Sequence, residues 1–211
     1  SNGNANMLFV DGGNDKVGIG TASPSADLNV ESTGGAEIHI SRDRSAGSFD
    51  ATGWGVGKLA FGGQDADSNE DNDAAYIWGR IPTTAEGGGA WSSSSHPMEL
   101  QFFTTPSSAT SASSRMTISA AGNVGIGTTS PDGTLHAHTA SAGSVSANAN
   151  ADDLVVENSG IGGISILTPD ANSARLYFGS ASDNDYGRII GNYNSGSPYL
   201  TLRTSVADTL V

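Results

Sequence analysis

The sequence predicts an all-β protein, built from repeated strand-and-turn units, whose elongated fold completes its core with other chains. Three observations predict this fold class. Apolar and polar residues alternate over short stretches, glycines interrupt these stretches at short intervals, and an eight-residue motif occurs twice. Alternation with a period of two is typical of strands, and frequent glycine is typical of the turns between them. No stretch shows the periodicity of an amphipathic helix.

The repeated motif reads Val-Gly-Ile-Gly-Thr-x-Ser-Pro and starts at Val17 and again at Val124, with seven of its eight positions identical. Each copy follows a short alternating stretch and a turn rich in Gly and Asn. A further alternating stretch comes after each proline. We expect strands at 8–10 and 28–30 around copy one, and at 116–118 and 135–137 around copy two. Copy one carries Asp15 and Lys16 as an insertion, which predicts a slightly longer turn there.

Shorter matches between the two halves of the chain follow the motif. They pair 34–38 with 162–166, 58–62 with 175–179, 79–81 with 187–189, and 99–102 with 199–202. The spacing changes only between the matches, as expected if the matched pieces are strands and the rest are surface loops. We therefore predict two β-repeat units, residues 1–110 and residues 111–211, the second incomplete at its C-terminus. The low-complexity stretch 140–158 is a candidate hinge between the units.

Composition limits the partners and the kind of core. Only 36% of residues are hydrophobic and 29 are glycine, which is little apolar surface for an isolated globule of 211 residues. A net charge of −13 with nine basic residues argues against a nucleic-acid partner. No apolar run reaches the ~20 residues that span a bilayer, so no membrane insertion is expected. The absence of cysteine excludes disulfides and thiolate zinc sites.

A family resemblance rests on copy two of the motif. Residues 115–118, followed by 122–131 and Leu135, closely resemble a repeat of phage tail fibres and related bacterial surface proteins. In that group the repeat often precedes a self-cleaving chaperone domain, which has no counterpart in this sequence. The resemblance covers both copies and, more loosely, the connecting strands. It implies an intertwined, parallel homotrimeric fibre, located in the virion or otherwise outside the cell or on its surface.

In such a trimer the motif would form a structural joint near the threefold axis. Glycine permits positive φ and close approach of backbones, so the single isoleucine between two glycines could point at the axis. The alternative is a plain glycine-rich turn within one chain. A dinucleotide-binding loop is disfavoured because Ser23 and Ser130 replace its third glycine. The joint residues are Val17, Gly18, Ile19, Gly20, Val124, Gly125, Ile126 and Gly127.

Two weak metal candidates were weighed against simpler interpretations. The acidic stretch 65–73 partly imitates a calcium loop, but a solvated surface loop is the preferred interpretation. Its candidate ligands are Asp65, Asp67, Asn69 and Asp71. His136 and His138 could line an axial metal site in a trimer. Strand parity opposes this, because Leu135 takes the core side and both histidines should then point outward.

Few residues are candidates for ligand contact or for catalysis. Trp54 and Trp91 lie in loops rich in Gly and Ser, and are candidates for contact with a glycan ligand. Trp78 adjoins a predicted strand and is expected to be packed. No nucleophile motif is present, and the histidines form no pattern with a serine and an acid, so neither an enzyme nor a cofactor is expected.

These features predict a structural segment of a trimeric phage tail fibre or receptor-binding appendage. The expected partners are two further copies of the chain, other fibre or baseplate subunits, and a host-surface glycan or protein reached through loops or a tip. Two alternatives remain open at this point: a polysaccharide depolymerase domain of a tailspike, and a bacterial adhesin or filament built from the same repeat.

Overall fold

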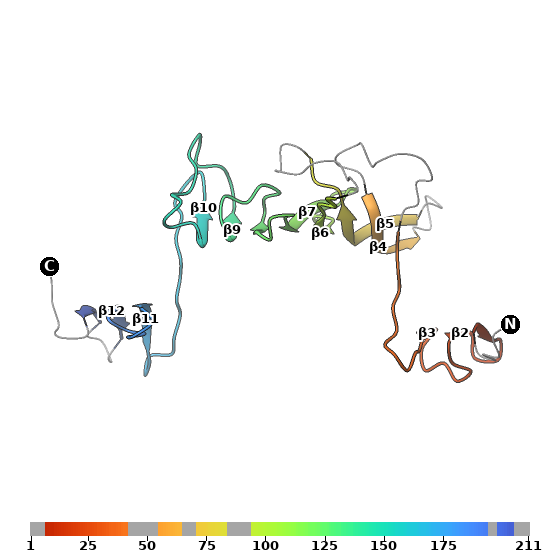
Figure 1. The fold of residues 1–211 in the computed structure, drawn as a ribbon. Helices are drawn as coiled ribbons and strands as arrows, with labels where there is room; N and C mark the ends of the chain where they lie inside the picture. The colour runs from red at the N-terminus through yellow and green to blue at the C-terminus, as the bar shows by residue number, and fades with distance from the viewer. Residues whose placement is uncertain (1–6, 42–54, 65–70, 84–93, 194–197, 205–211) are drawn as a thin grey trace. The chain divides into compact units, whose positions relative to one another are not determined.

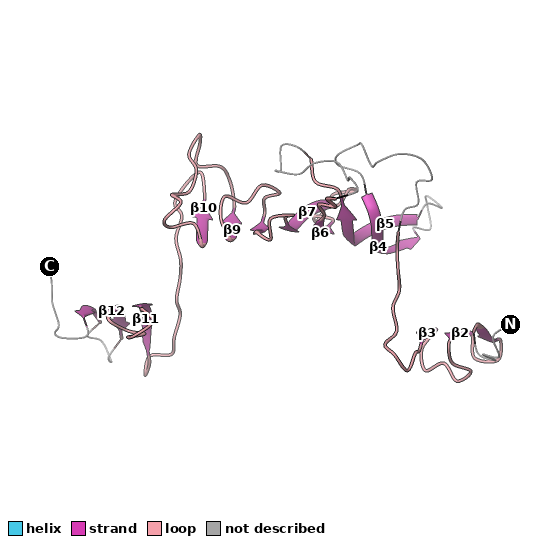
Figure 2. Cartoon of the chain, viewed as in Figure 1, coloured by secondary structure: helices cyan, strands magenta, loops and turns pink. Residues whose placement is uncertain are grey.

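Short strands make up the secondary structure of the computed structural model (Figures 1 and 2). It describes residues 7–41, 55–64, 71–83, 94–193 and 198–204. Within these ranges no helix occurs, which confirms the all-β prediction. A search of the same ranges finds no helix that could cross a membrane. The chain divides into two compact units, residues 1–139 with 144–155, and residues 140–143 with 156–211.

The first sheet surrounds copy one of the motif. It contains β1 (Phe9–Asp11), β2 (Lys16–Ile19) and β3 (Leu28–Val30), in that order. β1 and β2 form an antiparallel hairpin, and β3 returns parallel to β2. The connection from β2 to β3 is short for a parallel pair, which usually needs a dozen residues or more. A sharp turn after Ile19 is therefore required.

A seven-stranded sheet contains copy two and has the strand order β10-β9-β8-β7-β6-β5-β4. Strands β4 to β8 are antiparallel to their neighbours, whereas β8 and β9 are parallel. β7, β8 and β9 thus repeat the topology of β1, β2 and β3. The strands are β4 (Gly55–Gln64), β5 (Asp71–Arg80), β6 (Glu99–Thr104), β7 (Ser113–Ile118), β8 (Val124–Ile126), β9 (Leu135–His138) and β10 (Leu154–Glu157).

The second compact unit contains an antiparallel sheet of β11 (Ser173–Phe178), β12 (Gly187–Asn192) and β13 (Tyr199–Thr204). It repeats the pairing of β4, β5 and β6, as the sequence matches predicted for the outer two strands. The middle strand differs: Ile77 and Ile189 occupy equivalent positions in the two sheets. The match of 79–81 to 187–189 is therefore wrong by four residues. Alternation along the whole strand decides register, and a three-residue identity does not.

The predicted boundary at residue 110 lies between two hydrogen-bonded strands, β6 and β7. Compactness and sequence repetition divide the chain by different criteria, so the two repeat units remain a prediction. The boundary between the two compact units falls within residues 140–156, which lie inside the low-complexity stretch 140–158.

Buried residues in the described strands are more polar than apolar. Ile81 and Ile190 are the hydrophobic residues buried among the described ranges. Several polar side chains are buried as deeply, namely Thr21, Glu99, Gln101, Thr117 and His136. The described part of a single chain therefore has a very small apolar core.

Candidate functional site

The seven-stranded sheet has one apolar face and one polar face. Residues that pair across strands lie on the same face, so the register defines each row. The apolar row crosses six strands through Leu59, Ile77, Phe102, Met116, Ile126 and Ala137. The adjacent row on the opposite face contains Lys58, Trp78, Gln101, Thr117, Gly125 and His136.

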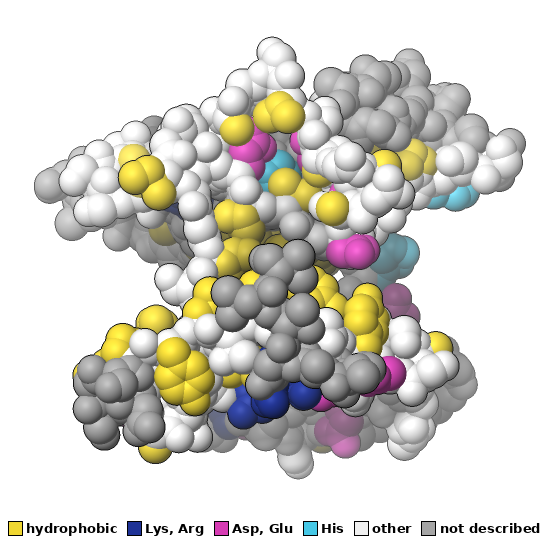
Figure 3. All heavy atoms as spheres, turned by 90° about the vertical axis from the view of Figure 1, so that its left-hand side faces the viewer, with side chains coloured by type: hydrophobic (Ala, Val, Ile, Leu, Met, Phe, Trp, Pro, Cys, Tyr) yellow, Lys and Arg dark blue, Asp and Glu magenta, His cyan; other side chains and the backbone are white. Residues whose placement is uncertain are grey.

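The apolar face is the exposed one in a single chain. Leu59 and Ile126 are each 50% exposed, and Leu100 and Leu135 are each 38% exposed. Figure 3 shows hydrophobic side chains at several places on the molecular surface. The first sheet shows the same arrangement, since Val10, Val17 and Leu28 form one apolar row. Contiguous apolar patches that exceed a few hundred Å² are rare on monomeric soluble proteins, and they are typical of interaction surfaces.

The polar face is buried over β6 to β9, where Glu99, Gln101, Thr117 and His136 are each at most 2% exposed. Arg80 forms an ion pair with Glu99, which also accepts a 2.9 Å hydrogen bond from Gln101. Trp78 packs edge-on against Phe103, at 5.9 Å between ring centroids. The guanidinium of Arg80 lies 5.6 Å from the centre of the Trp78 ring. Trp78 is therefore packed, as the sequence predicted.

The glycine joint has the same backbone conformation in both copies. Gly20 has a φ of 80° and Gly127 a φ of 79°, values that side chains rarely tolerate. A Cβ on Gly20 would lie 2.0 Å from the carbonyl oxygen of Glu31. On Gly127 it would lie 2.2 Å from that of His138. Each glycine therefore turns the chain sharply after the isoleucine and lets the returning strand pass against its backbone.

The first half of the joint is equally tight. A Cβ on Gly18 would lie 2.3 Å from the carbonyl oxygen of Thr21, and on Gly125 2.5 Å from that of Thr128. The second half of the motif thus folds back across the polar face of the sheet. Thr21 and Thr128 each accept a hydrogen bond from the backbone N–H two residues later, at 3.3 and 3.1 Å. Both copies are built within one chain, whether or not the isoleucines meet at an axis.

The segment that covers the polar face is held by one side chain in each copy. In copy one, Oδ1 of Asn29 accepts a 3.0 Å hydrogen bond from the N–H of Ser25. In copy two, Nδ1 of His136 accepts a 3.2 Å bond from the N–H of Asp132. These positions correspond between the copies. His136 therefore performs the structural role that an asparagine performs in copy one.

This arrangement corrects the prediction for the two histidines. They do lie on the opposite face from Leu135, but His136 is only 2% exposed because residues 128–132 fold over it. His138 is also partly buried, with its ring 5.5 Å from that of His136. The alternation of residues along the strand predicted correctly which face of the sheet the two histidines occupy. It predicted wrongly that this face is exposed.

We expect His136→Asn to be tolerated and His136→Leu to be destabilising. Asparagine restores an acceptor for the N–H of Asp132, so the free energy of unfolding should change by less than about 1 kcal/mol. Leucine removes the acceptor for that partly buried donor and leaves the imidazole's polar contacts unmade, at a cost of about 1–3 kcal/mol. Thermal unfolding followed by circular dichroism measures both variants. Equal destabilisation by the two substitutions would show that the imidazole has another role.

The hairpin of copy one has the longer turn that its insertion predicted. Six residues separate the paired Val10 and Val17, whereas five separate Ile118 and Val124. Asp11 closes this turn by accepting hydrogen bonds from the N–H of Gly13 and the side chain of Asn14. The bond from Asn14 is the main reason that the pKa of Asp11 lies below its ordinary value.

A groove lies between each three-strand repeat and the segment that precedes it, and sequence reasoning did not foresee it. One groove of about 330 Å³ is lined by Ile38, Gly57 and Leu100 among others. The equivalent groove of about 500 Å³ is lined by Ile166, Ala174 and Leu200 among others. The match of 34–38 to 162–166 was the signal that could have revealed it, because it predicted a common place for Ile38 and Ile166.

The remaining candidates are the two loop tryptophans and the acidic stretch. Trp54, Trp91, Asp65, Asp67 and Asn69 lie outside the described residues. Asp71 is the first residue of β5. Within the described ranges, no group of three or more His, Cys, Asp or Glu residues could hold a metal ion.

Comparisons with known proteins find similarity in solved structures alone. No family model matches the chain, and no curated protein matches it. One similar structure is the carboxy-terminal domain of the bacteriophage T5 L-shaped tail fibre with its intramolecular chaperone domain, at 13% identity and a TM-score of 0.47. That match covers 85% of this chain and 57% of the other. A second structure, the carboxy-terminal domain of the bacteriophage T5 L-shaped tail fibre, matches at 12% identity and a TM-score of 0.46, over 85% of this chain and 82% of the other.

Proposed function

We propose that this chain is a structural segment of a trimeric phage tail fibre or receptor-binding appendage, in which three parallel copies share one core. The observation that carries the proposal is the exposed apolar face of the strands. Rows of Leu, Ile, Val and Met cross both sheets of the first compact unit, while the polar face beneath the loops is already buried. A monomer would leave this apolar surface in water, and would lose a burial free energy of about 25 cal/mol for each Å² left uncovered.

Copies of the same chain are the simplest cover for this face. Homo-oligomers use closed rotational symmetry, and every copy then presents the same apolar row to the axis. Ile19 and Ile126, 41% and 50% exposed, lie on that face between two glycines that permit close backbone approach. The sequence resemblance of residues 115–135 supports three copies. The histidines lie on the other face, so this assembly does not place them at the axis.

The function of such a segment is mechanical and multivalent. It would support and project a binding region from the virion, and three identical chains would raise avidity for a repeated ligand on the host surface. We infer that the segment is not an enzyme. Incubation with host capsular polysaccharide should release no reducing ends, whereas release would favour the depolymerase alternative. Detection of the protein in purified virions would separate the phage origin from a bacterial adhesin.

Oligomeric mass is the direct test of the trimer. Native mass spectrometry and light scattering should give three times the chain mass of 21.3 kDa. Circular dichroism on the same sample should show β-structure, which separates failure to assemble from failure to fold. A folded monomer or dimer that unfolds cooperatively would contradict the proposal.

A further inference from the structure

We propose that the arginine-bearing face of β11, β12 and β13 binds an anionic saccharide, one with a carboxylate or phosphate substituent. Three of the chain's nine basic residues lie in this small sheet, one on each strand: Arg175, Arg188 and Arg203. The inference rests on the proposed function for its biological setting, since it names a ligand for host attachment. The site itself lies within one chain.

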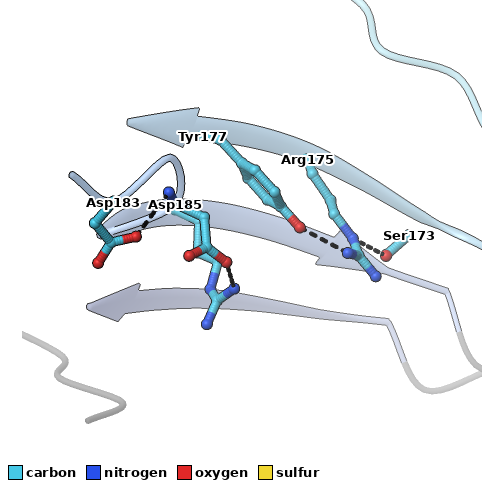
Figure 4. Close-up of polar contacts among 6 residues, drawn as sticks. Ser173, Arg175, Tyr177, Asp183 and Asp185 are labelled. Atoms are coloured by element: carbon cyan, nitrogen blue, oxygen red, sulfur yellow. Dashed lines mark hydrogen bonds and ion pairs between the residues drawn. The ribbon is translucent and has the colours of Figure 1, made fainter. Parts of the chain in front are cut away.

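Arg175 is held by neutral groups. Its Nε donates a 2.6 Å hydrogen bond to the hydroxyl of Ser173, and its Nη1 donates a 2.7 Å bond to the hydroxyl of Tyr177 (Figure 4). Among the described residues no carboxylate pairs with it. The guanidinium is therefore fixed in position while its charge is uncompensated, and its remaining N–H groups can bind an oxyanion at little entropic cost.

Tyr177 supplies the second part of the site. It is 42% exposed and its hydroxyl, which accepts the bond from Arg175, still has its own proton to donate. Arg188 lies 6.0 Å from the centre of its ring and is itself neutralised by an ion pair with Asp185. The turn before β12 holds Asp185 through a 3.1 Å bond from its N–H to Asp183 (Figure 4). The ring is thus a supported flat surface next to an unneutralised cation.

The register adds a further cation to the same face. Tyr177, Arg188 and Arg203 are partners across the three strands. A planar ring, hydroxyl donors and guanidinium groups together match a sugar ring with one acidic substituent.

The repeat provides an internal comparison. The positions of Tyr177, Arg188 and Arg203 correspond to Ala60, Tyr76 and Phe103 in the first compact unit. There Tyr76 and Phe103 stack at 4.4 Å. The same sheet therefore forms with aromatic packing at these positions, and its fold does not require the arginines. The chain's negative net charge also disfavours unspecific adsorption of polyanions, so binding must come from local donors.

The test compares Arg175→Gln with Arg115→Gln in the full chain. Arg115 is the matched control, because it is also an exposed strand arginine held by a hydroxyl, that of Thr104, and its loss changes the net charge equally. The probes are a tetra-galacturonate, a phosphorylated mannose tetrasaccharide, a neutral tetra-galactoside and a tetra-glutamate peptide, each titrated by calorimetry. The first two probes distinguish a carboxylate from a phosphate ligand.

We expect one or both anionic saccharides to bind, with at least tenfold weaker binding for Arg175→Gln and less than twofold for Arg115→Gln. No binding of either, equal loss in the two variants, or equal binding of the neutral saccharide or the peptide would overturn the inference. Light scattering of the same samples measures the oligomeric mass, so that the trimer and the saccharide site are tested separately. A monomer that binds sugar contradicts the trimer alone, and a trimer that fails these comparisons contradicts the saccharide site alone.

Discussion

Gly127→Ala should unfold the joint of copy two, lowering the free energy of unfolding by about 3–5 kcal/mol. Two costs combine at this position. A φ of 79° costs an alanine about 1–2 kcal/mol. The added Cβ would also lie 2.2 Å from the carbonyl oxygen of His138, and backbone cannot move aside as a side chain can. Since β9 returns directly against this glycine, the strand pairing of β8 with β9 must give way.

A second glycine, Gly122, separates the conformational cost from the steric cost. Gly122 has a φ of 90°, but nothing lies within 4 Å of the Cβ that an alanine would add there. Gly122→Ala should therefore cost only the conformational part, about 1–2 kcal/mol. Denaturant unfolding of both variants, with Gly20→Ala as the equivalent change in copy one, measures the difference. Equal effects at Gly127 and Gly122 would show that the close approach to His138 is unimportant.

Ile126→Asp should abolish assembly while leaving the strands of the single chain able to form. Ile126 is 50% exposed in the chain, so an oligomer would bury the other half, worth about 1 kcal/mol per chain. Aspartate loses this contribution and also brings an ionised carboxylate into an apolar interface, which costs several kcal/mol per ion. The trimer should therefore disappear at micromolar concentration in light scattering.

The control for this variant carries the same charge elsewhere. Ala121→Asp adds an aspartate in the exposed turn before β8, away from the apolar row, and should leave the oligomeric mass unchanged. Ile126→Val keeps an apolar side chain at the joint and should also assemble. Persistence of the trimer in Ile126→Asp would mean that the apolar row faces something other than the axis.

The internal repeat allowed many of the strands to be predicted from the sequence. Strands were expected at 8–10, 28–30, 116–118 and 135–137, and β1, β3, β7 and β9 lie there. The reason is that alternation and glycine punctuation are local properties of the backbone. The two copies of the joint then adopt one conformation because the same glycines meet the same steric constraint.

Other features depend on contacts between distant segments. The register of β12 places Ile189 beside Leu176 and Leu202, although a local match had suggested another alignment. The cluster of Arg175, Arg188 and Arg203 was not foreseen either. Its members are scattered along the sequence, and pairing of three strands is what brings them together.

The sequence by itself determined the strands, their two-faced character and the positions of the glycine turns at Gly20 and Gly127. Only the tertiary structure decided which face is covered. Alternation says that Leu135 and His136 lie on opposite faces, but it does not say which one the chain's own loops will cover. Because residues 128–132 fold over His136 and satisfy its hydrogen bond, the polar face around His136 is buried within one chain. The apolar face is left exposed, and this exposure points to assembly.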